Sequence, residues 1–529
     1  MYKKVLSLLL VLIMCTGLLA GCGGSGSGGA AGTDNSGTQA GSKATTGADG
    51  QDAAKGDTKG SDASADDGET VELKMVMISM GLNLEDAGKV QDAINAYIQP
   101  KINATVSIEW LDMGDFSNQL NLKLTSGETI DILPTFGTFV STLYAQDALS
   151  PMESLIETYG QDIVNAVGEE YMHAGYINGE LYAIPCIQSF AANYSFLYRT
   201  DIAEKYDLDF SNVKSIEDLT PLLAQLHEKE PGMSLLVSNN PSDPMLTSYH
   251  WDGLGDEYGV LMDPVNSLEV TNLYESQEYK DYVTLMHQWY ESGYIQTDAA
   301  TTSDNMATLL KAGNSFGVIG RSYPGVVENE SVNCGYTLGE VTLTDALSTT
   351  SDVNNMVITI PTTAANPEKA MAFINLLYSD AGLTNMLYYG IEGEHYQVVD
   401  EQLGKVGYVD GQDMMSCKYV NKLKVGNQLI AYIETTSPDN LNEAIESFNN
   451  AAGKSKALGF TYDSATVANQ LAALDTVSAK YRRGLECGSL NPETELPKFI
   501  EELKGAGIED VITEKQAQID AWAKANGVK

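Results

Sequence analysis

Hydrophobic and polar positions follow two alternating periods at the start of the folded sequence. Residues 71–80 form a nearly continuous apolar run, which is typical of a strand covered on both faces. Apolar residues recur at helical spacing over 90–98, alternate as in a strand over 104–110, and return to helical spacing over 116–124. Residues 130–133 predict a third strand. This order indicates a doubly wound α/β lobe with right-handed crossovers.

Ligands of such sheets bind beyond the carboxyl ends of the strands. In this chain those ends are residues 79–83, 111–115 and 134–138. We therefore expect a ligand site to use side chains from these three short segments.

The middle of the chain predicts a hairpin and further helices. Asn178-Gly179 lies between two short apolar pairs, and both residues tolerate the positive φ of a type I′ turn. Helices are predicted at about 276–290 and 303–311, each with a serine at its start and a glycine after its end. The long loop 238–266 contains Trp251, and loops of this length are usually functional or disordered.

The last third of the chain reads mainly as helix. Residues 356–360 predict a strand, and Asn366-Pro367 then opens a helix with a cap and a proline in its first turn. Apolar residues repeat at helical spacing over 467–481 and again over 508–522. We therefore expect a helical C-terminal extension.

The N-terminus has the anatomy of a secretory signal. Lys3 and Lys4 precede an apolar run, Val5 to Leu19, that is shorter than the roughly 20 residues that span a bilayer. The sequence Leu18-Leu19-Ala20-Gly21-Cys22 resembles a bacterial lipoprotein cleavage box. The resemblance implies a signal peptide over 1–21, with Cys22 as the lipidated first residue. The alternative is an ordinary signal, in which case Cys22 has no special role and the protein is freely secreted.

The segment after Cys22 cannot build a core. Residues 23–68 contain no aromatic residue and no Leu, Ile, Val or Met. Such a composition predicts disorder, so we interpret 22–70 as the lipidated cysteine with a flexible Gly/Ser/Ala/Asp tether.

Charge and cysteine content exclude several classes of function. The formal net charge of −41 repels nucleic acid phosphates and anionic lipid heads, so we expect no nucleic acid partner and contact with the membrane only through the lipid anchor. Cys186, Cys334, Cys417 and Cys487 remain in the folded part, without a C-x-x-C pair, and their pairing is left open. We expect no cofactor and no metal.

Four short motifs carry a family resemblance. They are Asn178-Gly-Glu-Leu-Tyr-Ala-Ile-Pro185, Leu197-Tyr-Arg-Thr-Asp201, Lys311-Ala-Gly-Asn-Ser-Phe-Gly317 and Asn366-Pro-Glu-Lys-Ala-Met371. In this order they resemble extracellular solute-binding proteins (family 1) of carbohydrate ABC transporters, the family of maltose-binding protein. The segment Tyr389-Gly-Ile-Glu-Gly-Glu-His-Tyr396 and the late helices look like those of a large Gram-positive lipoprotein subgroup.

The resemblance implies an α/β, two-lobed, periplasmic-binding-protein-like fold in which the lobes close about a hinge. Lobe one would contain residues 71–182 and 347–390. Lobe two would contain residues 183–346 and 391–529, including the C-terminal helices. The implied protein is a monomeric, non-enzymatic lipoprotein on the outer face of the cell membrane, which binds an oligosaccharide and delivers it to ABC permease subunits.

By position, the resemblance places eight residues in the ligand pocket. Sugar rings need flat aromatic faces for their C–H surfaces and polar groups for their hydroxyls. The eight residues are Met80, Asp112, Phe136, Thr138, Gln188, Trp251, Arg321 and Tyr323.

The aromatic candidates have structural alternatives. Trp289 and Trp522 lie on apolar helix faces and are expected in the core, whereas Trp110 fits core or rim equally. Trp251, in a Gly-rich loop, and Tyr323, at the end of a strand, fit ligand stacking better.

Two polar candidates have alternatives as well. Arg321 is also compatible with a surface ion pair to a carboxylate. Glu392, Glu394 and His395 could suggest a metal site, but no further ligand spacing supports one, so we expect a solvated loop.

Three other functions compete with solute binding. A peptide-binding lipoprotein is the runner-up, and an adhesin fits the sequence less well. For an extracellular hydrolase, Gly313-Asn-Ser-Phe-Gly317 matches G-x-S-x-G, but here a helix precedes the serine and a strand follows, the reverse of the α/β-hydrolase order. A glycosidase needs only two carboxylates, and the 72 acidic residues leave that alternative open.

Overall fold

The computed structural model describes residues 68–239 and 250–529. The expected signal peptide, Cys22 and nearly all of the tether lie outside the described residues, as do residues 240–249 of the long loop.

The elements fall into three consecutive groups. The first group runs to Pro185 and comprises β1 (Val71–Ser79), α2 (Ala87–Ile102), β2 (Ala104–Asp112), η1 (Met113–Asp115), α3 (Phe116–Thr125), β3 (Leu133–Phe136), η2 (Gly137–Phe139), α4 (Val140–Ala145), α5 (Glu153–Tyr159), α6 (Gln161–Val167), α7 (Glu169–Met172), η3 (His173–Gly175), β4 (Tyr176–Ile177), β5 (Glu180–Leu181) and β6 (Ile184–Pro185). The second group comprises β7 (Asn193–Arg199), α8 (Thr200–Lys205), η4 (Glu217–Leu219), α9 (Thr220–Lys229), β8 (Ser234–Leu236), β9 (Val260–Leu261), β10 (Val270–Thr271), η5 (Leu273–Glu275), α10 (Gln277–Glu291), α11 (Met306–Lys311), β11 (Ser315–Ser322), α12 (Val326–Cys334), β12 (Leu338–Thr342) and β13 (Leu347–Ser348). The third group comprises α13 (Thr350–Val353), β14 (Met356–Thr359), α14 (Pro367–Ser379), α15 (Ala381–Tyr389), β15 (Tyr396–Asp400), β16 (Lys405–Tyr408), η6 (Gln428–Ile430), β17 (Ile433–Glu434), α16 (Leu441–Ala451), β18 (Gly453–Lys454), η7 (Ala465–Val467), α17 (Ala468–Glu486), α18 (Pro492–Ala506) and α19 (Ile508–Asn526).

The predicted α/β start of the fold is confirmed. Strands β1 and β2 pair in parallel over nine positions, from Val71 opposite Ala104 to Ser79 opposite Asp112, with α2 between them in the chain. Ile132 makes a single parallel bridge to Met75. The third strand, β3, begins one residue later, at Leu133, and pairs antiparallel with β14. Strand β6 pairs with the other edge of β14.

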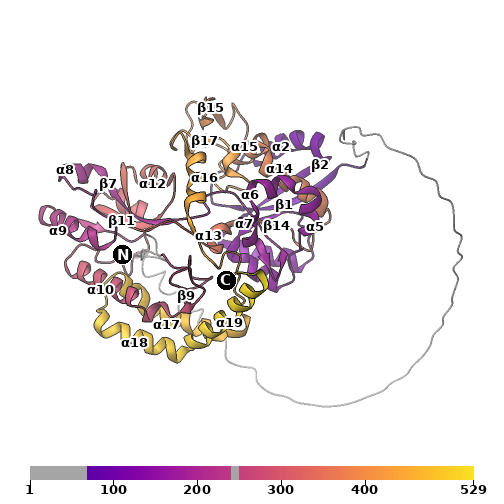
Figure 1. The fold of residues 1–529 in the computed structure, drawn as a ribbon. Coiled ribbons are helices and arrows are strands. Elements are labelled where there is room, and N and C mark those ends of the chain that lie inside the picture. Colours follow the sequence, from indigo (N-terminus) through magenta and orange to yellow (C-terminus); the bar gives the residue numbers. More distant parts are fainter. Residues whose placement is uncertain (1–67, 240–249) are drawn as a thin grey trace, which may run out of the picture. The chain divides into compact units, whose positions relative to one another are not determined.

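These strands and their helices form the first core. Its buried side chains come from residues 73–190 and 353–431 and include the apolar face of α2, such as Ile94 and Ile98. The interior of β1 and β14 is almost entirely apolar, as expected for strands with helices packed on them. Figure 1 shows β1, β2, β14, α2 and α14 gathered in one region of the ribbon.

A second sheet organises the second core. Its strand order is β12-β7-β11-β8, with β7 antiparallel to both of its neighbours and β8 parallel to β11. The buried side chains of this core come from residues 196–343 and 467–511. Trp289 is one of its largest fully buried members, and its ring nitrogen donates to the Thr220 hydroxyl at 3.1 Å, which confirms the expected core position.

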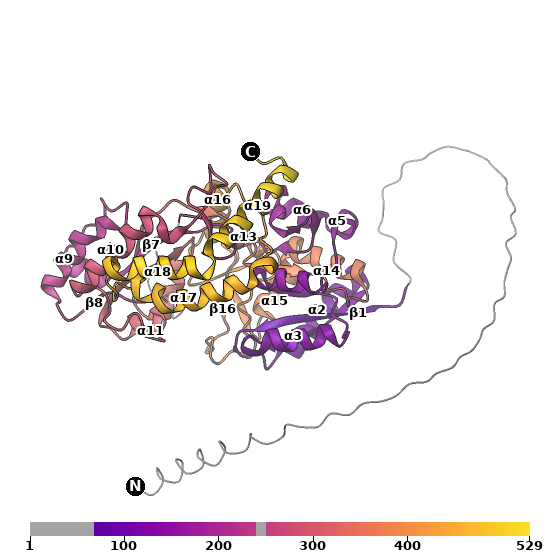
Figure 2. The same ribbon diagram turned by 90° about the horizontal axis from the view of Figure 1, so that it is seen from below.

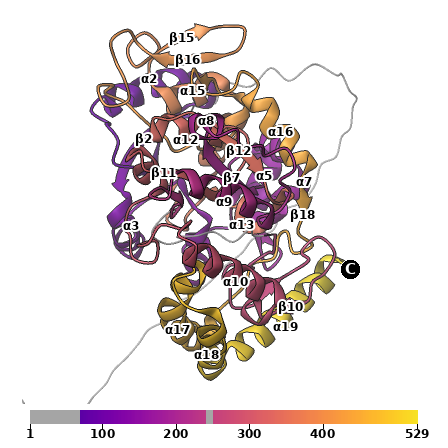
Figure 3. The same cartoon turned by 90° about the vertical axis from the view of Figure 1, so that its left-hand side faces the viewer.

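The C-terminal helices α17, α18 and α19 belong to this second body. All three contact one another, and α17 and α18 also contact α10. Figures 2 and 3 show them lying together beside α10. The predicted helical extension is thus confirmed, and it contributes part of the second core.

The turn signal and one of three expected helix caps were confirmed, and Asn366 begins α14 with Pro367 but makes no side-chain cap hydrogen bond. Asn178 and Gly179 have φ values of 53° and 88°, as a type I′ hairpin between β4 and β5 requires. Ser276 caps α10 by accepting a hydrogen bond from the Tyr279 amide at 3.0 Å. The start expected at Ser303 was wrong, because Asn305 caps α11 by accepting from the Thr308 amide.

Several short segments connect the two cores. Ala192 and Leu347 exchange backbone hydrogen bonds of 3.0 and 2.9 Å, and β13 pairs in parallel with β18. Buried side chains change from the first core to the second between Phe190 and Phe196. Side chains up to Ala431 contribute to the first core, although we expected residues after 390 in lobe two. The lobe boundaries therefore stay a prediction.

Candidate functional site

The described residues line an open cavity of about 1000 Å³ between segments of both cores. Five of its lining residues carry aromatic rings: Tyr194, Trp251, Tyr323, Tyr389 and Tyr432. Seven carry amide side chains: Gln188, Asn239, Asn329, Asn333, Asn355, Gln428 and Asn442. The charged lining residues are Asp252, Glu257, Arg321, Glu330, Asp352, Lys422, Lys424 and Glu434.

Four of the eight predicted ligand residues line this cavity. Gln188 belongs to the segment that connects the cores, Trp251 to the loop before β9, and Arg321 and Tyr323 to the carboxyl end of β11. The structure thus brings together residues that are up to 135 positions apart, as the resemblance implied for these four.

The other four predicted residues are not among those that line the cavity. Met80 is exposed just after β1, and exposed Asp112 ends β2, where its carboxylate accepts from the Gly114 amide at 2.9 Å. Phe136 and Thr138 lie at the end of β3 and in the turn after it. A direct ligand role for these four stays a prediction.

Trp251 serves the core and the cavity at once. Its side chain is only 9% exposed, and it packs in the second core while also lining the cavity. Trp251 therefore has a core position and a place in the cavity wall, and its stacking on a ligand stays a prediction. Tyr323, in contrast, is 42% exposed.

Arg321 has the carboxylate partner that its alternative reading predicted. Its guanidinium contacts the Asp352 carboxylate at 2.5 Å, and both side chains line the cavity. Asp352 itself completes a capping box with Thr349 at the start of α13. The ion pair therefore joins β11 to a segment near the first core.

Four lining residues have a buried polar atom that lacks a hydrogen-bond partner among the described residues. The atoms are Gln188 Nε2, Asp252 Oδ2, Lys424 Nζ and Asn442 Oδ1. Buried polar groups are nearly always hydrogen-bonded, and each unpaired one costs about 1–3 kcal/mol. Their gathering around one cavity indicates a site for a ligand rich in donors and acceptors.

The carboxylate of Asp252 is held in place by the backbone of its own loop. Its Oδ1 accepts from the Leu254 amide at 2.9 Å, which fixes the carboxylate, and Oδ2 has no hydrogen-bond partner among residues 68–239 and 250–529. Burial raises the pKa of Asp252, against the opposing hydrogen bonds from Ser455 and from the Leu254 amide. A ligand hydroxyl that donates to Oδ2 would stabilise the charged form.

Lys424 is the cation with the most unusual surroundings in this cavity. Its ammonium lies 4.4 Å from the ring centres of both Tyr388 and Tyr389. Burial lowers the pKa of Lys424 to about 8, although the Glu434 charge opposes this shift. Sequence reasoning missed Lys424, because the segment around it has no helical or strand period that would have placed it.

Tyr194 was also missed, but the sequence held a signal for it. Residues 194–199 read as a strand in the sequence, and Tyr194 begins it directly after the segment that leads from the first core to the second. Strand ends next to a crossing segment face the space between two bodies, so Tyr194 could have been added to the candidates.

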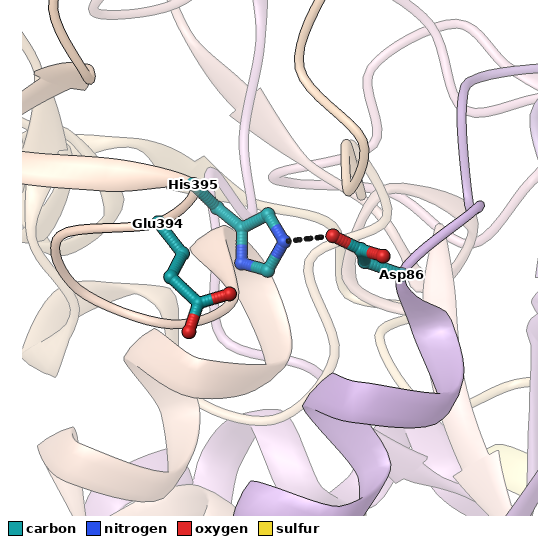
Figure 4. A group of neighbouring side chains, drawn as sticks. All are labelled: Asp86, Glu394 and His395. Atoms are coloured by element: carbon teal, nitrogen blue, oxygen red, sulfur yellow. Dashed lines mark hydrogen bonds and ion pairs between the residues drawn. The ribbon is translucent and has the colours of Figure 1, made fainter.

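One group of side chains has the composition of a metal site. Potential ligand atoms of Asp86, Glu394 and His395 lie within 4.8 Å of one another (Figure 4). His395 Nδ1 accepts from the Ile391 amide at 3.0 Å, so Nε2 carries the proton and donates to Asp86 at 3.3 Å. The Lys89 ammonium contacts both carboxylates, at 3.2 and 3.5 Å.

This group is satisfied by its own members and by Lys89, so it serves to join α2 to the segment after α15. Burial alone would raise the pKa of Asp86, but hydrogen bonds from Lys89 and His395 outweigh it and lower the pKa. The expectation of a solvated loop was wrong for His395, which is 2% exposed.

The hydrolase motif keeps its reversed direction in the structure. Helix α11 precedes Ser315 and β11 begins at it, and the buried Ser315 hydroxyl donates to the Leu309 carbonyl at 3.1 Å.

The four cysteines of the described part are buried free thiols. Burial raises the pKa of both Cys186 and Cys487 to about 12, which keeps them protonated and unreactive. Within the described residues, none of the helices is long and apolar enough to cross a membrane.

Comparisons with known proteins give two family matches and a relative. Residues 87–383 match the bacterial extracellular solute-binding protein family, and residues 456–524 match a domain of unknown function. A carbohydrate ABC transporter substrate-binding protein from Streptococcus pneumoniae is 26% identical over 481 residues, covering 88% of this chain and 94% of the relative.

Solved structures show the same fold. The crystal structure of the N-glycan transport solute-binding protein from Streptococcus pneumoniae is 25% identical with a TM-score of 0.77, and the alignment covers 86% of this chain and 99% of that one. The same S. pneumoniae protein in complex with Man5GlcNAc is 25% identical with a TM-score of 0.65, at the same coverage of both chains. The prediction of a solute-binding component rather than an enzyme is confirmed by the family match. The chain belongs to the bacterial extracellular solute-binding protein family.

Proposed function

We propose that this protein captures an oligosaccharide in the cavity between its cores and delivers it to the permease subunits of an ABC importer. The observation that carries the proposal is the set of four buried polar atoms that have no hydrogen-bond partner in the described part of the chain, around a cavity that also has five aromatic rings. An oligosaccharide supplies hydroxyls for the former and C–H faces for the latter.

The size of the cavity favours an oligosaccharide over a single sugar. Small-molecule sites occupy roughly 300–1000 Å³, and the cavity of about 1000 Å³ lies at the upper end of that range. Its aromatic residues come from widely separated segments, among them Trp251, Tyr323 and Tyr432, so that several rings of a glycan could be contacted at once.

Mannose-containing glycans are the first candidates. The relative from Streptococcus pneumoniae is described as an N-glycan transport protein, and its structure was solved with Man5GlcNAc. The same class of ligand suits a cavity with many hydrogen-bonding side chains. In this proposal the protein acts as a monomer, and the two cores close on the glycan about the connecting segments near Ala192 and Leu347.

A ligand screen tests the proposal. Calorimetry of the purified chain should detect one class among mannose-rich N-glycans, other oligosaccharides and peptides, and chromatography should recover the ligand unchanged. Asp252→Asn keeps the size of the side chain but removes the charged acceptor, so we expect about 10- to 100-fold weaker binding. Peptide binding without glycan binding would favour the runner-up, and conversion of the glycan would indicate a hydrolase.

The lipid anchor is the second part of the proposal, and it rests on the cleavage box at Cys22. Replacing Cys22 with Ala should move the protein from the membrane fraction to the medium, because a lipid chain on that cysteine is the expected attachment. Immunoblots of washed membranes and of the medium measure this shift. Glycan affinity of the released protein should equal that of the wild type. Retention of the variant on washed membranes would contradict the anchor.

A further inference from the structure

The loop of residues 251–259, here called the cleft loop, forms one wall of the cavity. Trp251, Asp252, Gly253 and Glu257 all line it. The backbone of this loop is unusual, since Leu254, Gly255 and Gly259 have positive φ values of 54°, 101° and 132°. A non-glycine residue such as Leu254 is uncommon in this conformation, so contacts from outside the loop must hold it there.

Those contacts come from the C-terminal helices. Lys515 of α19 is fully buried beneath the loop, and its ammonium donates to the carbonyl oxygens of Gly253 and Gly259 at 3.3 and 3.0 Å. The same ammonium binds the Asp256 carboxylate at 2.6 Å. One side chain therefore ties down the beginning, the middle and the end of the cleft loop.

Helix α17 adds two more ties. Arg482 binds the Glu257 carboxylate with both terminal nitrogens, at 2.7 and 3.0 Å, and Asp475 accepts from the Tyr258 hydroxyl at 2.8 Å. Helix α19 also approaches Gly259 closely, because a Cβ atom at Gly259 would lie 3.1 Å from the Ile512 side chain.

A charge buried as deeply as that of Lys515 is costly unless it is fully hydrogen-bonded. A leucine or methionine would pack a helix against the core more cheaply, so stability alone does not account for this lysine. Within the described residues, the three hydrogen bonds of its ammonium all go to the cleft loop, and the ammonium also lies 5.1 Å from the centre of the Tyr462 ring. Hydrogen bonds that all go to one loop are expected if Lys515 holds that loop in position.

We propose that the C-terminal helices, matched only to a domain of unknown function, set the ligand affinity of the cavity by holding the cleft loop through Lys515. Lys515 is thus a positioning residue, which acts on the ligand through Trp251 and Asp252. The inference rests on the proposed function, since it assigns the affinity of that same cavity to a region outside it.

The test compares Lys515→Met with Lys504→Met. Methionine keeps the apolar length of the lysine but removes the ammonium. Lys504 lies on α18 and pairs with Glu275 at 2.5 Å, so its replacement removes a more exposed ion pair between the C-terminal helices and the rest of the second body without touching the cleft loop. Calorimetry measures affinity for the glycan found in the screen, and hydrogen exchange measures the amides of the loop.

We expect about 10-fold or weaker binding in Lys515→Met, because three hydrogen bonds to the loop are lost, one of them charge-assisted at both ends. The amides of Asp252 and Leu261, which bond to each other's carbonyls, should exchange faster, while those of β7 and β11 stay protected. Lys504→Met should match the wild type in both measurements. A purely structural lysine would instead lower protection throughout the second core.

If Lys515→Met does not fold, the same measurements are made on Tyr258→Phe. This change deletes the hydrogen bond from the Tyr258 hydroxyl of the loop to Asp475 of α17. About 3- to 5-fold weaker binding is then expected. Wild-type affinity in the folded Lys515→Met protein, or an equal loss in Lys504→Met, would overturn the inference and leave the proposed function standing. A wild-type protein that binds no oligosaccharide would refute both.

Discussion

Replacing Trp251 with Ala is expected to lower the free energy of unfolding by about 3–5 kcal/mol and to weaken glycan binding as well. The indole is only 9% exposed and packs in the second core, so its removal leaves a cavity. The same ring lines the ligand cavity, so part of the sugar contact is lost too. Urea titration measures the first effect, and calorimetry on the folded protein measures the second.

Tyr323→Ala is the matched comparison. This ring lines the same cavity but is 42% exposed, so its loss should cost less than about 1 kcal/mol of folding stability. Binding should weaken by about 1–3 kcal/mol, roughly 5- to 150-fold, because an aromatic contact to the sugar is removed. Native affinity in both variants would show that the ligand site lies elsewhere.

Lys424→Met is expected to raise the free energy of unfolding at pH 7 by about 1–3 kcal/mol. Burial lowers the pKa of Lys424 to about 8 from its ordinary value of 10.5, and Lys424 Nζ has no hydrogen-bond partner among the described residues. The folded protein therefore carries a charge that would be more stable in water. The two tyrosine rings 4.4 Å away offset part of this cost through cation–π attraction. The expected gain in the free energy of unfolding is therefore smaller than the pKa shift alone would give.

The gain in stability from Lys424→Met should decrease as the pH rises above about 8. Below about pH 8 the lysine is charged in both states, and the wild type bears the full cost. Between about pH 8 and 10.5 the unfolded wild type holds more protons than the folded one, so wild-type stability rises with pH and the advantage of the variant shrinks. Urea titrations at several pH values follow this change.

Lys422→Met provides the control for the Lys424 experiment. Lys422 lies two residues earlier, and its ammonium pairs with the Glu434 carboxylate at 2.6 Å on a partly exposed surface. Its replacement should change stability by less than about 1 kcal/mol, without the dependence above pH 8. A Lys424→Met protein that is less stable than the wild type at pH 7 would mean that the ammonium is well paired in solution.

Much of the fold was predictable because hydrophobic periodicity reports local burial. The apolar run from Val71 and the helical repeat around Ile94 predicted β1 and α2 within a few residues of their observed bounds. Asn178-Gly179 predicted its hairpin, because few residue pairs accept two positive φ values. The order of α11 and β11 around Ser315 was also predicted correctly, and a helix ahead of that serine argues against the hydrolase alternative.

The site was predictable only in part. Gln188, Trp251, Arg321 and Tyr323 line the cavity, and all four were predicted by their positions relative to the family resemblance. Met80 was placed by analogy with its strand end, and it is not among the lining residues. The end of a strand shows where a side chain leaves the sheet. The direction in which that side chain points depends on how the other core packs against the sheet.

The sequence by itself determined those strands, helices and turns that have a clear local period or turn signal, since these depend on residues within about one turn of helix or one hairpin of each other. Only the tertiary structure decided which polar atoms meet. It placed Lys515 under a loop about 260 positions earlier in the chain, and His395 against Asp86 309 positions away. Such pairings leave no local period, because the energy that fixes them comes from burying the partners together.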